Sequence, residues 1–508
     1  MIDEFFPSNG AVLNEKSTSV QSLLFGHRIK PQQTRYEYLV EFLQVAMARK
    51  NIGENLFFTE MFPICEEVNE QTVEYRPISN MGLKRFLFFN NSRLDTKSEA
   101  DREAYKKCLS ILNERVNTDG IDDLSADECI TILQNVLYGF SIENAGRSWF
   151  YKTLFPVCPA VLFPESVGRK NKRKDVACDS SEVDTSFDFN SYTYMARGGE
   201  VYYLHLLHAA NTQGKDRCTN LEEQLRKMIN SIPELSRLCD FIQNEWVEGN
   251  QFEEDDLDCV KKKMHFIPSS FGYRDANTLS ELICFLSNQI QPMEKMDILS
   301  YGIVLQLFRL MTTTAAKGSG TCGSAWVLDM CDSGKKEQAE IRKLASKAFN
   351  MNEEAFTKYI DIGIEHFRSD CNDDEKAKCR KDASEDTVKL IRKLGKSMGI
   401  IIPINGQFMR FTLSEEVIKF LVMSLIPPTS KVTFDYFLDL LYDHFEMVVS
   451  AEHYLRAVSE GKAAKCSSLT FLSGNKTAFA QKLKNCGFLR DLSDATAIVE
   501  NPYEREDD

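Results

Sequence analysis

The sequence lacks the features of a secreted, membrane-spanning or disulfide-stabilised protein. Its 15 cysteines are scattered, none stands in a Cys-x-x-Cys pair, and an odd count of this kind is typical of reduced thiols. The N-terminal residues MIDEFF carry acids where a secretory signal is basic, so we expect no signal peptide. The densest apolar run, 301–311, contains Gln306 and Arg309, which predicts no membrane span. We therefore expect a cytoplasmic protein without a membrane partner.

An excess of positive charge is also absent. The 508 residues include 61 Lys and Arg against 75 Asp and Glu, which gives a formal net charge of −14. A surface that is acidic overall does not attract nucleic acid or anionic lipid through its whole area. Any contact with nucleic acid must therefore come from a local basic face.

Recognisable catalytic and cofactor motifs are missing as well. Residues 318–323 fit G-x-G-x-x-G, but a predicted helix precedes them where a dinucleotide site needs a strand. Residues 395–399 fit G-x-S-x-G, but they run from helix to strand, the reverse of a nucleophile elbow. His205 and His208 lie three residues apart with no further ligands at zinc spacing. The sequence predicts no cofactor and no metal, and it favours a binding protein over an enzyme.

The sequence is rich in helical periodicity and has a few short strands. Its 43% hydrophobic and 27% charged residues are ordinary for a globular protein, and its length predicts several domains. We expect a predominantly helical, multidomain α+β protein. Its predicted parts are an N-terminal α+β domain at 1–165, a polar basic linker at 166–187, a central mainly helical domain at 188–345 and a C-terminal region at 346–508.

Apolar spacing and capping signals predict individual elements in the first two domains. In the N-terminal domain we predict a strand at 85–90 and helices at 35–48, 100–112 and 125–138, the last with Ser125 and Glu128 as a capping box. In the central domain we predict helices at 220–230, 234–246, 277–290 and 296–311.

The C-terminal region twice repeats one plan, in which a basic helix ends at a glycine and a hairpin follows. The first copy has a helix at 387–396 and strands on either side of Asn405-Gly406, a dipeptide that favours tight hairpin turns. The second has a helix at 476–485 and a hairpin at 488–499. Helix, glycine and hairpin in this order form the second half of a winged helix-turn-helix. We therefore predict one or two winged-helix units at the C-terminus.

Both copies contain windows with basic residues and no acids, although the chain as a whole is acidic. Phosphate contacts need Lys or Arg side chains that nearby carboxylates do not neutralise. We predict nucleic-acid contacts at Lys389, Arg392, Lys393, Lys396, Arg410, Lys476, Lys482, Lys484 and Arg490. The alternatives are that the basic helix faces are only solvated, and that the winged helices bind a protein partner.

Arg197 is a candidate for an anion contact, because Gly198 and Gly199 follow it. Glycines let backbone amides approach an anion, and a guanidinium pairs with phosphate. The alternative is a strand-to-helix turn in which Arg197 forms a structural salt bridge, for example to Glu200.

Four pieces of the chain, 25–43 (FGHRIKPQQTRYEYLVEFL), 137–150 (LYGFSIENAGRSWF), 196–206 (ARGGEVYYLHL) and 407–422 (QFMRFTLSEEVIKFLV), resemble accessory, non-motor components of bacterial multigene antiphage defence systems. The resemblance implies a cytoplasmic bacterial protein that acts with partner subunits. It transfers no catalytic residue to this chain.

Together these observations predict an adaptor subunit of a cytoplasmic nucleic-acid-processing complex in antiphage defence, which binds double-stranded DNA through its C-terminal winged-helix region. One alternative is a protein-interaction scaffold that does not bind nucleic acid. A second is a nuclease or other hydrolase, for which a buried cluster of Asp or Glu with Lys or His would be the sign.

Overall fold

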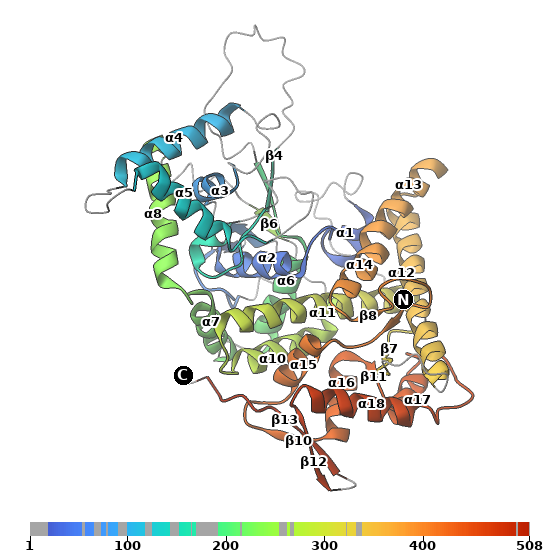
Figure 1. The fold of residues 1–508 in the computed structure, drawn as a ribbon. Helices are drawn as coiled ribbons and strands as arrows, with labels where there is room; N and C mark the ends of the chain where they lie inside the picture. Colours follow the sequence, from blue (N-terminus) through green and yellow to red (C-terminus); the bar gives the residue numbers. More distant parts are fainter. Residues whose placement is uncertain are drawn as a thin grey trace.

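The computed structural model shows a predominantly helical protein with several small sheets (Figure 1). It describes residues 19–52, 56–65, 73–77, 80–89, 99–116, 124–142, 152–163, 165–168, 192–213, 216–252, 262–264, 269–321, 323–331, 338–493 and 496–506. Most of the predicted linker, 169–187, lies outside the described residues.

The helices form most of the body. In chain order the α-helices are α1 (Val20–Phe25), α2 (Arg35–Met47), α3 (Met81–Phe88), α4 (Glu99–Arg115), α5 (Ala126–Tyr138), α6 (Arg197–Gln213), α7 (Asp216–Ile229), α8 (Pro233–Asn250), α10 (Asp275–Leu286), α11 (Pro292–Ser319), α12 (Ala339–Phe367), α13 (Asp373–Ser384), α14 (Leu390–Ser397), α15 (Glu415–Leu425), α16 (Phe434–Phe445), α17 (Ala451–Ser459) and α18 (Leu472–Asn485). Short 3-10 turns are η4 (Pro159–Val161) and η6 (Ser269–Arg274), and the π-helical turn η8 (Glu385–Lys389) leads into α14.

The strands form small, mainly antiparallel sheets. One sheet has the order β2 (Leu56–Phe58), β1 (Arg49–Ile52), β3 (Val73–Arg76) and β6 (Lys262–Met264). A second has the order β10 (Lys431–Thr433), β13 (Thr496–Glu500) and β12 (Leu489–Ser493). The remaining pairs are β4 (Glu165–Gly168) with β5 (Tyr192–Met195), β8 (Ile401–Ile402) with β9 (Arg410–Phe411), and the parallel pair β7 (Trp326–Val327) and β11 (Met447–Val448).

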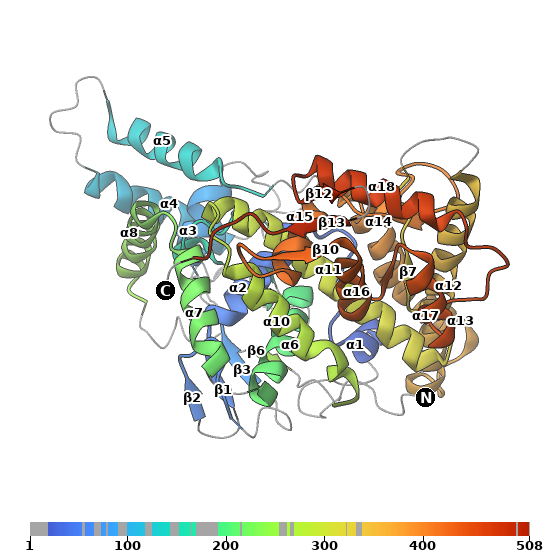
Figure 2. The ribbon, with the colours of Figure 1, turned by 90° about the horizontal axis from the view of Figure 1, so that it is seen from below.

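The centre of the molecule is the long helix α11, which packs against α2, α6, α12 and α15 (Figures 1 and 2). Pro292 begins the helix, and Gly320 ends it in the left-handed conformation. Among the described residues, α11 is the one helix long and apolar enough to cross a membrane, but 94% of its most apolar window is buried inside the molecule. Such burial is typical of the core helix of a soluble protein.

The largest hydrophobic core joins all three predicted folded parts of the chain, from Val20 to Val499. The predicted boundary at residue 345 lies inside α12. Figures 1 and 2 place α4, α5 and α8 at one end of the molecule and α12 and α13 at the other. Helices α3, α4, α5 and α8 enclose a second, smaller core around Trp246.

Several predicted elements are confirmed, and one is wrong. Helix α5 begins at the predicted capping box, in which the Ser125 amide donates to the Glu128 carboxylate at 2.9 Å. The predicted strand at 85–90 is wrong, because residues 85–88 form the end of α3, whose residues are buried on every side; residue 90 lies outside the described residues. A short apolar run fits a buried helix as well as a strand, and periodicity cannot distinguish the two.

The segment 414–500, here called the C-terminal unit, contains α15 to α18 and the sheet β10–β13–β12. Its predicted hairpin is confirmed as β12 and β13, with Arg490 opposite Ile498. The predicted hairpin of the first copy is also present, but it is reduced to the two residue pairs of β8 and β9. Gly406 provides the positive φ of 113° that its turn requires.

Candidate nucleic-acid interface

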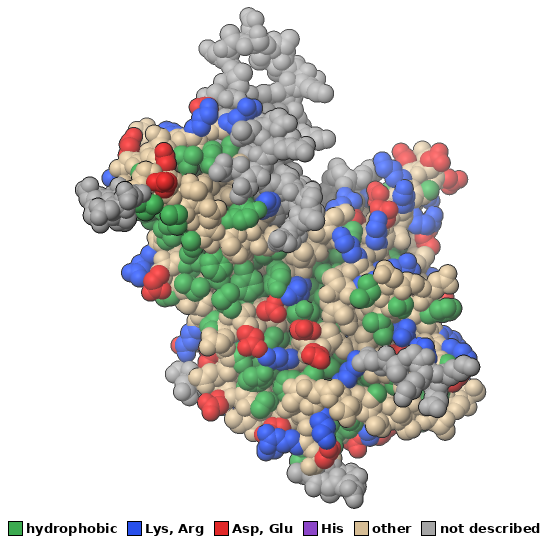
Figure 3. Space-filling model, viewed as in Figure 1, with side chains coloured by type: hydrophobic (Ala, Val, Ile, Leu, Met, Phe, Trp, Pro, Cys, Tyr) green, Lys and Arg blue, Asp and Glu red, His purple; other side chains and the backbone are tan. Residues whose placement is uncertain are grey.

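Four of the predicted phosphate-binding residues lie on one exposed face of η8 and α14. Leu390, Ile391 and Leu394 turn into the core. The opposite face, exposed in whole or in part, carries Lys389, Arg392, Lys393 and Lys396. Their spacing of three and four residues aligns them on the helix, as the sequence predicts. Figure 3 shows Lys and Arg side chains over this region, with acidic side chains between them.

The cations of this face differ in their ion pairs. Arg392 binds Glu353 of α12 with two hydrogen bonds, at 2.5 and 2.6 Å, and these bonds raise the pKa of Arg392. Lys389 lies 3.9 Å from Glu385, one helical turn away. Lys393 and Lys396 form no ion pair with any residue that the structure describes. The face therefore keeps two lysines for an external anion.

Two further cations, which the sequence analysis did not identify, lie beside this helix. Arg28 and Lys30, in the loop between α1 and α2, both contact the buried Asp386 of η8, at 2.6 and 3.4 Å. Burial, opposed by Asp386 and reinforced by Arg28, lowers the pKa of Lys30. The acid-free run 25–34 is the sequence signal that could have revealed them.

Arg410, the fifth cation of the first copy, lies in a different environment. Its Nε donates to Asp329 at 2.5 Å, and Asp329 is fully buried while Arg410 is 14% exposed. Asp329 also accepts the amide of Cys331 at 3.0 Å. The pair fastens β9 to the segment that follows β7, so it gives Arg410 a structural role.

The basic residues of the C-terminal unit lie near acids that stand outside the acid-free window 475–490. Lys476 pairs with Asp435 of α16 and Lys484 pairs with Asp491 of β12, while Arg490 pairs with Glu500 across the hairpin. Lys482 is half-buried near the end of α18. All three pairs are at least partly open to solvent, so a phosphate can compete for the cations.

Arg197 begins α6 and is 7% exposed, so it offers almost no surface to a dissolved anion. The Gly199 amide donates a hydrogen bond to the Glu41 carboxylate at 3.0 Å, so the anion that it binds belongs to the protein itself. A Cβ atom at Gly199 would lie 2.4 Å from the backbone nitrogen of Phe42. The glycines therefore serve the close packing of α6 on α2.

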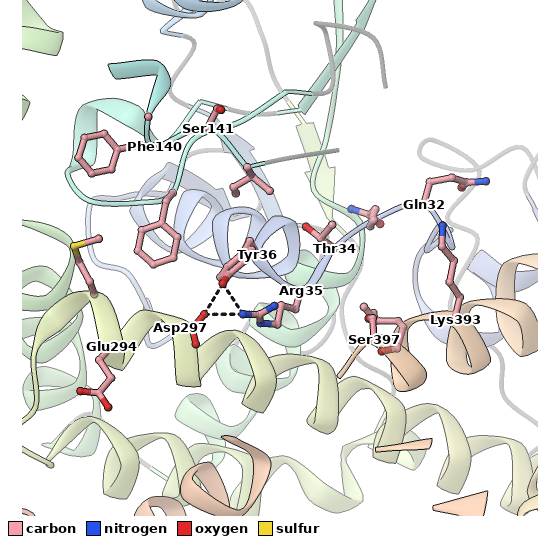
Figure 4. A pocket seen from close by; sticks show the side chains of 16 residues that line it. Gln32, Thr34, Arg35, Tyr36, Phe140, Ser141, Glu294, Asp297, Lys393 and Ser397 are labelled. Carbon is pink, nitrogen blue, oxygen red and sulfur yellow. Dashed lines mark hydrogen bonds and ion pairs between the residues drawn. The ribbon is translucent and has the colours of Figure 1, made fainter. Parts of the chain in front are cut away.

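A cavity of about 920 Å³ opens beside α14. The N-terminal ends of α2 and α11, the segment after α5, and Lys393, Leu394 and Ser397 of α14 line it. Figure 4 shows Lys393, Ser397 and Gln32 on one side of the cavity and Phe140 and Glu294 on the other. Lys393 thus belongs both to the basic face and to the cavity wall.

Three side chains form the floor of this cavity between its two sides (Figure 4). One oxygen of Asp297 accepts hydrogen bonds from Arg35 at 2.7 Å and from the Tyr36 hydroxyl at 2.5 Å. Burial, together with the hydrogen bond to Asp297, raises the pKa of Tyr36 to about 12. The Arg35 guanidinium lies between the rings of Tyr36 and Tyr301, 4.0 and 4.3 Å from their centroids.

His205 and His208, which lie three residues apart in the sequence, share one hydrogen-bond partner. The Nδ1 atoms of His205 and His208 each lie 2.6 Å from a different oxygen of Asp275. The Asp275 side chain is only 3% exposed, so this cluster is closed to a substrate. Within the described ranges, no group of three or more His, Cys, Asp or Glu residues could hold a metal ion.

Comparisons with known proteins identify no relative: no family model matches the chain, and no curated protein or solved structure matches it.

Proposed function

We propose that this protein binds double-stranded DNA, with the basic face of η8 and α14 as a principal contact. The observation that carries the proposal is the alignment of Lys389, Arg392, Lys393 and Lys396 on one exposed helix face. Neutralising phosphates releases condensed counterions, which gives such a face its affinity. Arg28 and Lys30 lie beside this face, but both are paired with Asp386.

The order of elements in the C-terminal unit supports a winged helix as a second contact. In chain order come α15, β10, α16, the short β11 and α17, then α18 and the hairpin β12–β13, with β10 paired to β13. In a winged helix the helix before the hairpin enters the major groove. That helix is α18 here, and its exposed face carries Ser473, Thr477 and Gln481, which can hydrogen-bond to base edges.

We further propose that the protein is an adaptor subunit in a cytoplasmic complex of bacterial antiphage defence. The support is the resemblance of the four sequence pieces, together with apolar side chains available to a protein partner. Ile404 and Phe408, in the turn between β8 and β9, are 67% and 73% exposed. Exposed apolar residues on a turn favour a protein contact.

The exposed side chains of Ile404 and Phe408 also favour a second candidate, a protein-interaction scaffold that does not bind DNA. A hydrolase is a weaker candidate. Asp275 and its two histidines match the buried acid and histidine cluster that would mark one, but the carboxylate is closed to solvent.

The deciding experiment is fluorescence anisotropy of the 508-residue chain with a labelled duplex of about 30 base pairs, repeated from low to physiological salt. We expect log K to fall with log salt with a slope of about −0.9 per phosphate contact, and hence about −3 to −4 for the α14 face. Absence of binding at low salt would contradict DNA binding and leave the scaffold. In that case, partner capture with Phe408→Ser as a control would test the scaffold.

A further inference from the structure

The cavity beside α14 is lined by aromatic and apolar side chains, by two carboxylates and by a lysine. One class of ligand matches all three. We propose that the cavity holds a single nucleotide, with the base on the aromatic side and the phosphate at Lys393. This inference deepens the proposed DNA binding and rests on it for the source of the nucleotide. The source is an unstacked nucleotide of a strand lying on α14 or a free mononucleotide, and the chemistry of recognition is the same for both.

The apolar side of the cavity suits a flat aromatic ring. Phe140, Phe155 and Met293 line it, and Tyr36 meets Phe155 edge to face with ring centroids 5.5 Å apart. Figure 3 shows hydrophobic side chains gathered between α5 and α11. Nucleobases stack on such side chains with little dependence on sequence.

Two carboxylates on α11 keep oxygens that can accept hydrogen bonds. Asp297 uses only Oδ1 for Arg35 and Tyr36, and the structure gives its Oδ2 no partner among the described residues. Glu294 uses Oε1 for Lys419 and is 50% exposed. An exocyclic amino group of adenine, cytosine or guanine is a donor that a carboxylate recognises.

The opposite side of the cavity is cationic and polar. Lys393 and Gln32 lie there and form no hydrogen bond or ion pair with the described part of the chain (Figure 4). The carboxylates of Glu294 and Asp297 would repel a small anion, and the ammonium group of Lys393 would repel a small cation. A nucleotide with an amino group at one end and a phosphate at the other satisfies both sides.

The position of the cavity favours a nucleotide over other ligands that have a hydrogen-bond donor at one end and a negative charge at the other. Lys393 continues the row formed by Lys389, Arg392 and Lys396, along which a phosphodiester chain would run. The volume of about 920 Å³ exceeds that of one nucleotide and lies in the range of ligand pockets. The Arg35 guanidinium, held between two tyrosine rings, makes the floor rigid.

The test measures binding of deoxyadenosine monophosphate, and of its analogue without the 6-amino group, by calorimetry. The variant is Glu294→Gln with Asp297→Asn, and the matched control is Glu340→Gln with Asp361→Asn on α12. We expect wild type and control to bind the amino ligand at least tenfold more tightly than the analogue. The cavity variant should lose this preference, a readout that general destabilisation would not produce.

The source is decided with 2-aminopurine placed within the labelled duplex. If the strand supplies the nucleotide, fluorescence rises several-fold on binding to wild type and not to the cavity variant, because unstacking relieves quenching. If the ligand is free, the monophosphate binds but this signal is absent. Either result supports the cavity.

Failure of the two proposals can be told apart. The inference is overturned if the monophosphate does not bind at millimolar concentration and 2-aminopurine fluorescence does not change, even where the duplex binds in a salt-dependent way. Conversely, if the wild-type protein binds the monophosphate but fails to bind the duplex even at low salt, the result supports the cavity and rejects DNA binding.

Discussion

The basic face of α14 and the C-terminal unit contain similar acid-free runs of Lys and Arg, yet their surroundings differ. On α14 the cations share one exposed face, and Lys393 and Lys396 have no acidic partner among the described residues. In the C-terminal unit, Lys476, Lys484 and Arg490 each face a carboxylate. The C-terminal unit, in turn, has the three-stranded sheet and helix order that the α14 region has only in reduced form.

The comparison teaches that charge and topology are separate evidence for nucleic-acid binding. A local window shows which charges are near in sequence, but the neutralising acid often comes from another element. The α14 face is therefore the stronger candidate for affinity, and α18 is the stronger candidate for reading base edges.

The largest expected effect concerns how the C-terminal unit is fixed to the body. Arg309 of α11 is fully buried and donates to Glu446, at the end of α16, at 2.6 Å. Removing one member of a buried pair costs about 3–5 kcal/mol, and because Lys462 still lies 3.0 Å from Glu446 we expect the lower end of this range, about 3 kcal/mol. We expect Arg309→Met to lower the free energy of unfolding by this amount in urea titrations. A loss below about 1 kcal/mol would show that the pair does not fix the unit.

The ion pair of Arg309 and Glu446 also predicts that the folded protein becomes less stable at low pH. Burial would raise the pKa of Glu446, but the charges of Arg309 and Lys462 outweigh it and lower the pKa to about 2. A lowered carboxylate pKa stabilises the folded state above the ordinary value near 4.5, and this contribution is lost as pH falls toward 2. We expect the stability difference between wild type and Glu446→Gln to shrink by about 3 kcal/mol over that range. A difference independent of pH would contradict the assignment.

A smaller effect is expected for the exposed cations of α14. Lys393→Glu with Lys396→Glu should weaken duplex binding at least tenfold, about 1.4 kcal/mol or more. The melting temperature should stay nearly unchanged, because exposed charges contribute little to stability. Arg237→Glu with Lys343→Glu, at exposed positions on α8 and α12, is the matched control. Unfolding of the α14 variant would mean that the face is not a free surface.

The smallest effect is expected for the exposed pairs of the C-terminal unit. Arg490 is 67% exposed and lies 3.2 Å from Glu500. Arg490→Ala should change the free energy of unfolding by less than about 1 kcal/mol, measured by urea titration. A larger loss would show that the hairpin depends on this pair and would make its cations unavailable to phosphate.

Much of the helical fold could be predicted from the sequence, because periodic apolar residues and caps act locally. Helix α5 has both signals and was predicted almost to the residue. Helix α12, of 29 residues, was not predicted, although its buried residues recur at helical spacing. Packing decides the remaining elements: residues 85–88 belong to the buried helix α3, which packs against α8.

The candidate site could be predicted only in part. Helical spacing is enough to align Lys389, Arg392, Lys393 and Lys396. The partners of Arg392 and Arg410 lie 39 and 81 residues away, so no local window reveals them. The cavity was not predicted either, because its walls come from five separate segments of the chain.

The most direct test measures duplex affinity against salt for two double reversals, Lys393→Glu with Lys396→Glu on α14 and Lys476→Glu with Lys484→Glu on α18. We predict that the α14 reversal weakens binding at least tenfold and makes the salt slope shallower by about 2, because two phosphate contacts are lost. The α18 reversal should weaken binding less, since its lysines already have acidic partners. Equal affinity and slope for wild type and the α14 variant would contradict the account.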